Sequence, residues 1–131
     1  MTYGGNASYF VAMTDETPEI SFRDGTLSIN GRSIPEDAKG FYSPVISHVD
    51  GWCTDGRLRD IEVCLEYFNK GTSSELLYMF MALEDGLKCG TLSDAEIRWR
   101  YDEDDDCMRE AGLEYSDLVD VAFRLIEMAD S

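Results

Sequence analysis

The sequence predicts an α/β fold, a single domain in which helices pack on a mixed β-sheet. Several short segments alternate apolar and polar residues, which is typical of strands. Other segments repeat apolar residues at helical spacing, and the two kinds of segment follow one another along the chain. With 131 residues, 44% of them hydrophobic, the chain suits one domain with one core.

The predicted domain spans residues 9–131. Before it, the first eight residues (1–8, MTYGGNAS) are expected to form a flexible tail. YFVAM, residues 9–13, is rich in β-branched and aromatic side chains and predicts a short first strand.

Residues 20–29 predict a β-hairpin. Apolar and polar residues alternate there, and the segment contains one turn dipeptide, Asp24-Gly25, and precedes another, Asn30-Gly31. Glycine supplies the positive φ that tight hairpin turns require, so both dipeptides are expected to be turns.

A helix is expected after this hairpin. Ser33 is a candidate N-cap, and Pro35 with the acids after it suits a first turn. The helix is predicted around residues 41–52, although Pro44 and Gly51 interrupt its pattern.

The second half of the chain alternates strands and helices. Residues 60–68 (DIEVCLEYF) predict a central strand, and 73–88 carry leucines and phenylalanine at helical spacing. AEIRWRY (95–101) predicts another strand. The acids that open 102–115 favour a helix start, and 117–128 are expected to form a strand or a short helix.

Three hydroxyl residues precede the central helix: Thr72, Ser73 and Ser74. A hydroxyl before an apolar helical run usually accepts a hydrogen bond from a free backbone N–H. Thr72 with Glu75 matches the capping-box spacing. Thr72 is therefore predicted at or within one turn of the helix start, with its side chain reachable by solvent.

The charge balance restricts the partners. Eleven Lys and Arg face 27 Asp and Glu, a net charge of -16. Such a chain repels nucleic acid and anionic membranes, and a charged partner is expected to present a basic surface. No apolar run is long enough to cross a bilayer, and the N-terminus does not resemble a signal peptide, so a cytoplasmic protein is expected.

Cysteine spacing predicts neither disulfides nor zinc. Cys53, Cys64, Cys89 and Cys107 form no CxxC pair, and a cytosolic domain of this size needs no cross-links. They are expected to be reduced thiols, with Cys64 in the core. His48 is the only histidine, and its expected role is structural.

Neither a cofactor nor a metal ion is predicted. An EF-hand loop begun at Asp102 needs glycine at its sixth position and glutamate at its twelfth, where this chain has Cys107 and Leu113. The chain also lacks the short motifs of nucleophilic or phosphate-binding sites. An enzyme that uses acidic residues is therefore the least favoured interpretation.

Three blocks of sequence resemble the SiaC-type regulatory phosphoproteins: residues 17–37 (TPEISFRDGTLSINGRSIPED), 65–77 (LEYFNKGTSSELL) and 99–119 (WRYDEDDDCMREAGLEYSDLV). They stand in the family's order. The resemblance implies a STAS-like fold, similar to anti-sigma-factor antagonists. It also implies a bacterial adaptor that a serine/threonine kinase phosphorylates at the start of the central helix and a phosphatase restores. A diguanylate cyclase is among the partners that the resemblance implies. The unmodified protein is expected to bind this enzyme and promote cyclic-di-GMP synthesis.

The chain departs from the family at this helix start. The family pattern reads Asn-Thr-Ser-Ser, whereas Asn69 here is followed by Lys70 and Gly71. Counting forward from Asn69 places Lys70 at the threonine position, and counting back from Trp99 places Thr72 there. The phosphorylation candidates are Thr72, Ser73 and Ser74, and the predicted partner-binding loop comprises Asn69, Lys70, Gly71, Thr72 and Glu75.

Two functions remain open from the sequence. One is an adaptor switched by phosphorylation of this segment, since a phosphate at a helix N-terminus is favoured by the dipole and adds about two negative charges. The other is a protein-binding module of the same fold that has lost the switch.

Overall fold

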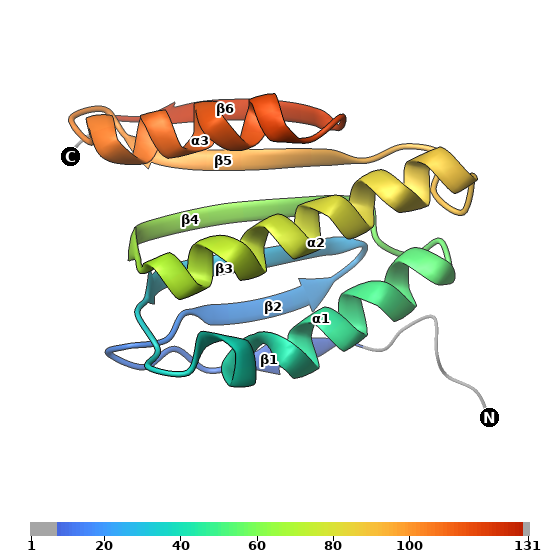
Figure 1. The fold of residues 1–131 in the computed structure, drawn as a ribbon, viewed down its shortest axis with the longest axis horizontal. Coiled ribbons are helices and arrows are strands. Elements are labelled where there is room, and N and C mark those ends of the chain that lie inside the picture. The colour runs from blue at the N-terminus through green and yellow to red at the C-terminus, as the bar shows by residue number, and fades with distance from the viewer. Residues whose placement is uncertain (1–7, 130–131) are drawn as a thin grey trace.

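In the computed structural model, which describes residues 8–129, three helices cover one face of a six-stranded sheet (Figure 1). The mixed α/β fold predicted from the sequence is confirmed. The predicted tail, apart from Ser8, lies outside the described residues. The elements, in chain order, are β1 (Tyr9–Val11), β2 (Glu19–Arg23), β3 (Thr26–Ser33), α1 (Ala38–Thr54), β4 (Asp60–Phe68), α2 (Lys70–Cys89), β5 (Glu96–Asp102), α3 (Asp106–Leu118) and β6 (Ala122–Met128).

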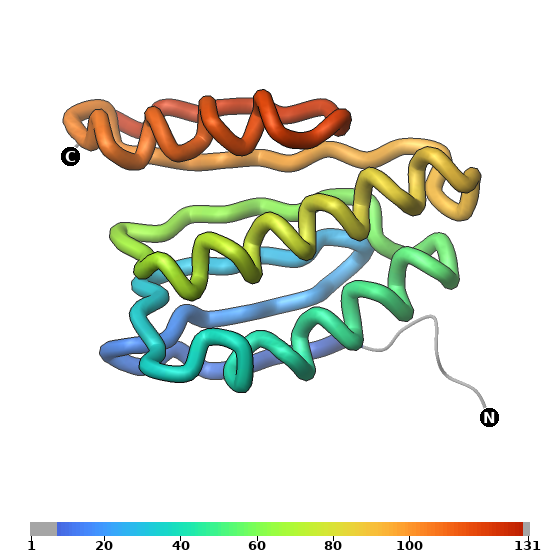
Figure 2. Tube along the Cα trace, viewed as in Figure 1, coloured from blue at the N-terminus to red at the C-terminus, as the bar shows by residue number. Residues whose placement is uncertain are grey.

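The strands lie in the sheet in the order in which they occur in the chain. β1, β2 and β3 are antiparallel neighbours, whereas β3, β4, β5 and β6 run parallel. Each parallel step crosses over through one helix, and every crossover moves in the same direction along the sheet (Figure 2). Because such crossovers are right-handed, all three helices come to lie on the same face.

The core lies between that face and the helices. The alternation in β4 places Ile61, Val63 and Leu65 against the helices, as predicted for a central strand. Trp99 of β5 is fully buried, and its indole N–H donates to the carbonyl of Met108 at 2.9 Å. α2 covers this region with its apolar stripe, begins three residues earlier than predicted, and ends where Gly90 takes a left-handed conformation.

Only one of the two predicted turn dipeptides is a turn. Asp24-Gly25 joins β2 to β3, and both residues have positive φ. Asn30-Gly31 lies inside β3 instead, so the prediction of a second turn is wrong. The register between β3 and β4 shifts between Gly31 and Arg32, and Gly31 has a φ of 114°. The glycine therefore serves a bulge within a strand.

The predicted start of the first helix is also wrong. Ser33 is the last residue of β3 and is fully buried, and Pro35 precedes the helix. The N-cap is Asp37, whose carboxylate accepts from the N–H of Gly40 at 3.0 Å. β3 is longer than predicted because its pairing with β4 continues through the bulge to Ser33.

No described helix covers the opposite face of the sheet, which carries charged side chains. The Arg98 guanidinium contacts Glu62 at 2.9 Å and Glu96 at 3.1 Å, and Arg100 contacts Glu62 at 2.7 Å. Cys64 lies among them and is half-buried, so its predicted place in the core is wrong. Parallel sheets usually have helices on both faces. Here the ion pairs make the open face of the sheet polar, so it can face solvent.

The acidic segment opens α3, as predicted. The side chain of Asp105 caps the helix by accepting from the N–H of Met108 at 3.0 Å. After α3, the chain forms β6 rather than a short helix. The C-terminal element is thus the last parallel strand and one edge of the sheet.

Candidate partner-binding site at the start of α2

Asn69, and not Thr72, caps α2. Its backbone is extended, and its side-chain oxygen accepts from the N–H of Thr72 at 3.0 Å. The amide nitrogen of Asn69 donates to the carbonyl of Pro35 at 3.0 Å and so ties the cap to the segment before α1. Because the helix begins at Lys70, Thr72 already lies within its first turn. The predicted position of Thr72 within one turn of the helix start is confirmed, but the capping role that its spacing with Glu75 suggested belongs to Asn69.

Thr72 is also inaccessible to solvent, contrary to prediction. Its side chain is 0% exposed. Its hydroxyl donates to the carbonyl of Ser33 at 3.1 Å and lies 2.8 Å from the hydroxyl of Ser33. The Ser33 hydroxyl in turn lies 2.7 Å from the phenolic oxygen of Tyr42 in α1. We call Ser33, Tyr42 and Thr72 the hydroxyl network.

The hydroxyl network joins three elements inside the core. Burial raises the pKa of Tyr42 to about 12, although hydrogen bonds with Ser33 and Thr72 oppose the rise. Tyr42 is therefore neutral and can donate at neutral pH. Since an unpaired buried hydroxyl is costly, the three groups hold the ends of β3, α1 and α2 in one arrangement.

The predicted partner-binding loop is the first part of α2 and not a loop. Lys70 and Gly71 are exposed, whereas Thr72 and Glu75 are buried. Of the three hydroxyl candidates, Ser74 is exposed and Ser73 is half-buried. The helix thus separates the candidates, because successive residues point about 100° apart around its axis.

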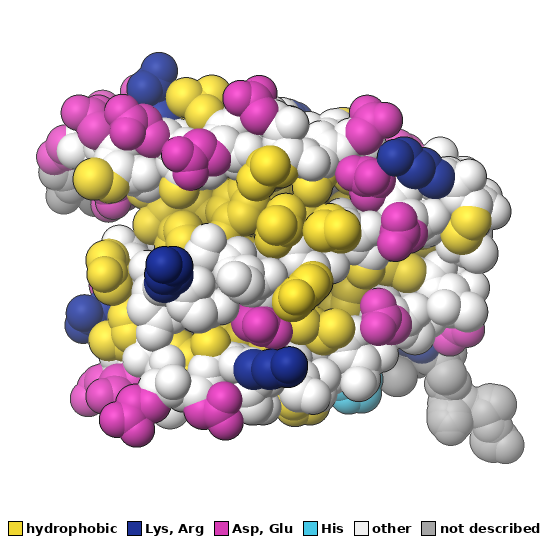
Figure 3. Space-filling model, in the orientation of Figure 1, with side chains coloured by type: hydrophobic (Ala, Val, Ile, Leu, Met, Phe, Trp, Pro, Cys, Tyr) yellow, Lys and Arg dark blue, Asp and Glu magenta, His cyan; other side chains and the backbone are white. Residues whose placement is uncertain are grey.

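A groove runs between α2 and α3. α1 packs on α2, but α3 packs on β5 and β6, which leaves a hollow of about 210 Å³ between the two later helices. We call it the α2–α3 groove. It is lined by Phe68, Ser73, Ser74, Leu77, Ala111, Glu114, Tyr115 and Leu118. Figure 3 shows hydrophobic side chains gathered between these helices, with acidic side chains along α3.

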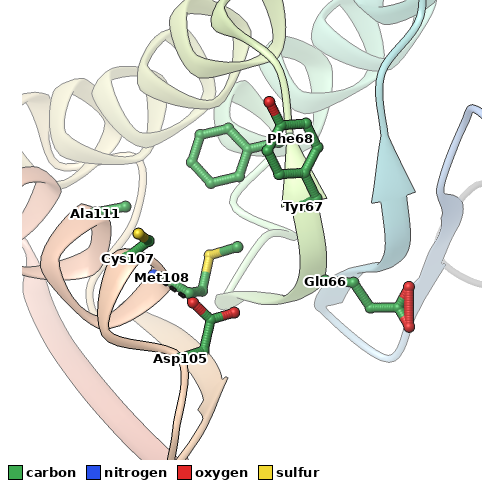
Figure 4. Close-up of a pocket in the computed structure, with 7 residues that line it drawn as sticks. All are labelled: Glu66, Tyr67, Phe68, Asp105, Cys107, Met108 and Ala111. Carbon is green, nitrogen blue, oxygen red and sulfur yellow. Dashed lines mark hydrogen bonds between the residues drawn. The ribbon is translucent and has the colours of Figure 1, made fainter.

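The groove continues toward the end of β4. A second hollow of about 170 Å³ shares Phe68 and Ala111 with the first and adds Tyr67, Cys107 and Met108, among others (Figure 4). Together the two hollows make up a mainly apolar α2–α3 groove that extends from the start of α2 to the start of α3.

Exposed apolar side chains border the α2–α3 groove. Leu118 is 64% exposed and Tyr67 is 55% exposed. The acids Glu66, Asp105 and Glu114 also line it. An apolar groove with an acidic border fits a partner that presents apolar side chains flanked by basic ones.

Tyr115 connects the two sides of the groove. Its hydroxyl donates to the backbone carbonyl of Ser73 at 2.8 Å and lies 3.1 Å from the Ser73 hydroxyl. Burial raises the pKa of Tyr115, and the hydrogen bond with Ser73 opposes this. A modification of the Ser73 side chain would therefore directly alter a contact between α2 and α3.

The sequence analysis did not identify the α3 side of this site. One signal for it is present in the sequence. The buried residues Met108, Gly112, Tyr115 and Val119 form a helical stripe, and Leu118 falls outside that stripe. An apolar residue outside the core stripe of an amphipathic helix is a candidate contact residue.

The described residues show no metal or membrane-spanning feature. Within residues 8–129, no three His, Cys, Asp or Glu side chains are grouped so that they could hold a metal ion. None of the described helices is long and apolar enough to cross a membrane. Cys53, Cys64, Cys89 and Cys107 are all free thiols, and burial raises the pKa of Cys53 to about 11.

Solved structures of known proteins share this fold. SiaC of Pseudomonas aeruginosa superposes with a TM-score of 0.83 at 24% identity, over 93% of this chain and 99% of that one. A chain in the solved complex of the P. aeruginosa diguanylate cyclase SiaD with its activator SiaC superposes with a TM-score of 0.82 at 23% identity. The match covers 92% of this chain and 99% of that one.

Sequence comparison agrees with the fold. An uncharacterized protein of Pseudomonas aeruginosa (strain UCBPP-PA14) is 28% identical over 105 residues, which are 78% of this chain and 82% of that protein. The model of the SiaC family regulatory phosphoproteins matches residues 11–128. This match runs from the last residue of β1, Val11, to the last residue of β6, Met128, and the chain therefore belongs to the SiaC family of regulatory phosphoproteins.

Proposed function

We propose that this protein is a cytoplasmic signalling adaptor, without catalytic activity of its own, that binds a protein partner in the α2–α3 groove. We further propose that phosphorylation at the start of α2 controls this binding. One observation carries the proposal: Ser73 and Ser74 line the same groove as its exposed apolar side chains. A phosphate added there would change the surface that the partner touches.

The proposed partner is a diguanylate cyclase. The structural relative SiaC is the activator of such an enzyme, SiaD. In this chain, Phe68, Leu77 and Leu118 supply apolar contact area, and burial of that area would drive binding. The acidic border and the net charge of -16 favour a partner segment with basic residues.

Ser74 is the phosphorylation site that the geometry supports best. A kinase must reach the hydroxyl, and Ser74 is exposed whereas Thr72 is enclosed in the hydroxyl network. Ser73 is half-buried, and its hydroxyl is hydrogen-bonded to Tyr115, so a kinase reaches it less easily. A phosphate on Ser74 would place a charged, hydrated group at the apolar groove. Removing its water when the partner's apolar side chains bind would be costly and would weaken binding even to a partner with basic residues. Lys70, four residues earlier, would balance part of the charge. A serine/threonine kinase and a phosphatase are then further partners.

A second candidate function is a protein-binding module that works without phosphorylation. The position of Lys70 favours it. Asn69 is the N-cap, so Lys70 occupies the first helical position, where the family pattern has threonine when counted forward from Asn69. With Thr72 buried, the hydroxyl nearest to that position is not available to a kinase.

Calorimetric titration with a purified diguanylate cyclase tests the proposal. Ser74→Asp is expected to weaken binding about tenfold or more, and Ser74→Ala to leave it intact, because only the aspartate places a charge that must lose its water where the partner's apolar side chains bind. Ser47→Asp adds the same charge on the exposed face of α1 and is the matched control. Leu118→Lys is expected to abolish binding, since it places a charge among apolar contacts.

The outcomes separate the two candidates. If Leu118→Lys abolishes binding but Ser74→Asp binds as wild type, the protein is a module without a switch at Ser74. If Leu118→Lys binds normally, the groove is not the partner site. Intact-protein mass spectrometry after incubation with the cognate kinase, followed by peptide mapping, shows directly whether Ser74 gains a phosphate.

A further inference from the structure

The two edges of the sheet differ in a way that points to a second interaction surface. One edge is β1, which has three residues. The other is β6, which has seven, Ala122–Met128, and no described element lies beyond it (Figure 1). An edge strand presents unpaired N–H and C=O groups along its outer side and is a template for another strand.

β6 lacks several of the features by which proteins protect such an edge. Its sequence, AFRLIEM, contains no proline, glycine or lysine. Its register with β5 runs without a bulge from Ala122 to Met128. Arg124 and Glu127 are its only charged residues, and Phe123, Leu125, Ile126 and Met128 are half-buried. A regular, mostly apolar edge of this length favours pairing over exposure.

We propose that a second copy of this chain pairs along β6, antiparallel, to form a homodimer with one continuous sheet. A two-fold axis normal to the sheet keeps the faces of both copies aligned, so only residues on the same face can oppose each other. The axis must then pass beside one residue of β6. With the axis at Leu125, Ala122 opposes Met128 and Arg124 opposes Ile126.

This register is the one that β6 itself favours. It pairs all seven residues of the strand with one another and places no like charges directly opposite. An axis at Arg124 would place two guanidinium groups face to face, which is destabilising. An axis at Ile126 would leave both Ala122 and Phe123 without partners inside the strand. The occupant that fits β6 best is therefore another β6.

The proposed dimer has a geometric consequence for the groove. Because the axis is normal to the sheet, the helical layers of both copies lie on the same side. α3 packs on β5 and β6, so the two α2–α3 grooves open on that side, one on either side of the axis. A partner with two copies of its binding segment would engage both grooves and gain avidity.

Sedimentation equilibrium of the full chain over a range of concentrations tests the dimer. We expect a monomer–dimer equilibrium that added salt strengthens, because each copy carries a net charge of -16. The variant Ala122→Lys with Ile126→Lys places edge lysines on the outer face and is expected to raise the dissociation constant more than about tenfold. Phe10→Lys on the β1 edge is the matched control and is expected to dimerise as wild type.

Cross-linking tests the register. In a background of Cys89→Ser and Cys107→Ser, Leu125→Cys is expected to form a covalent dimer on oxidation. Residues directly opposite in an antiparallel pair have Cα atoms about 4.5–5.5 Å apart, within the reach of a disulfide. Phe10→Cys is expected to remain monomeric. Circular dichroism of each variant shows that the fold is retained.

Three results would overturn the proposal. One is a monomer at all concentrations and salt conditions. Another is a dimer that the lysine pair on β6 leaves unchanged, since a different face would then hold it together. The third is a covalent dimer from Phe10→Cys but not from Leu125→Cys.

Discussion

The Oγ1 atom of Thr72 lies 2.8 Å from the Oγ atom of Ser33, and both side chains are fully buried. This contact joins the first turn of α2 to the last residue of β3. It divides the three hydroxyls at the start of α2 into two kinds. Thr72 belongs to the core, and Ser73 and Ser74 belong to the groove.

The hydroxyl network is expected to stabilise the fold. Thr72→Val keeps the shape of the side chain but removes the donor to the Ser33 carbonyl and the partner of the Ser33 hydroxyl. We expect it to lower the free energy of unfolding by about 1–3 kcal/mol. Thr72→Ser keeps the hydroxyl and should cost less. Urea denaturation of both variants measures this, and equal losses would show that the hydrogen bonds contribute little.

Thr72→Glu is expected to be unsuitable as a phosphate mimic for the same reason. It would bury a carboxylate in the core beside Ser33 and Tyr42, which costs several kcal/mol. Its thermal unfolding midpoint should fall well below that of Ser74→Glu, which places the same charge at an exposed position. Similar midpoints for the two variants would contradict the buried position of Thr72.

The cap of α2 gives a second test of the helix start. Asn69→Ala removes the acceptor for the Thr72 N–H and the donor to the Pro35 carbonyl. We expect a loss of about 1–2 kcal/mol in the free energy of unfolding. Lys70→Ala changes the next, exposed residue and should be nearly neutral. Thr72 would have to be reconsidered as the cap if Asn69→Ala unfolded like wild type.

Gly112 is expected to tolerate no side chain. A Cβ atom there would lie 2.6 Å from Cδ1 of the buried Trp99, whose indole is held by the Met108 carbonyl. Gly112→Ala should therefore destabilise the protein by about 1–3 kcal/mol. Gly51→Ala in α1 meets no atom within 4 Å and should be neutral or stabilising by up to about 1 kcal/mol. Chemical denaturation compares the pair, and an equal response at both sites would refute the steric argument.

The ion pairs on the open face predict a dependence of stability on pH. Burial alone would raise the pKa of Glu62, but hydrogen bonds from Arg100 and Arg98 outweigh it and hold this pKa below its usual value. A carboxyl whose pKa is lower in the folded state binds fewer protons there than in the unfolded chain. Its contribution is therefore complete above the ordinary glutamate pKa and is lost as the pH falls through the lower, folded value.

Glu62→Gln is the matched variant for that prediction. At neutral pH it should lower the free energy of unfolding by roughly 1–2 kcal/mol, because the amide cannot pair with both arginines. The difference from wild type should shrink as the pH falls below about 4, where unfolded glutamate protonates. Urea denaturation at several pH values measures it, and a difference that does not change with pH would exclude Glu62 as the titrating group.

Sequence by itself determined the elements whose signals are local. The alternation in residues 60–68 and the helical spacing in 73–88 predicted β4 and α2, because a side chain's face follows from the period of its own element. Asp24-Gly25 predicted its turn, since the required positive φ is a property of the dipeptide. The hydroxyl cluster likewise directed attention to the start of α2.

Only the tertiary structure decided what non-local packing controls. Asn30-Gly31 carries the same turn chemistry as Asp24-Gly25, yet pairing with β4 extends the strand through it and makes it a bulge. Thr72 and Ser74 have the same chemistry in the sequence. One is buried because β3 ends beside it and the other is exposed beside α3, and no local pattern contains either contact. The α2–α3 groove exists because the sheet sets two helices apart, a spacing that depends on strand order and not on either helix alone.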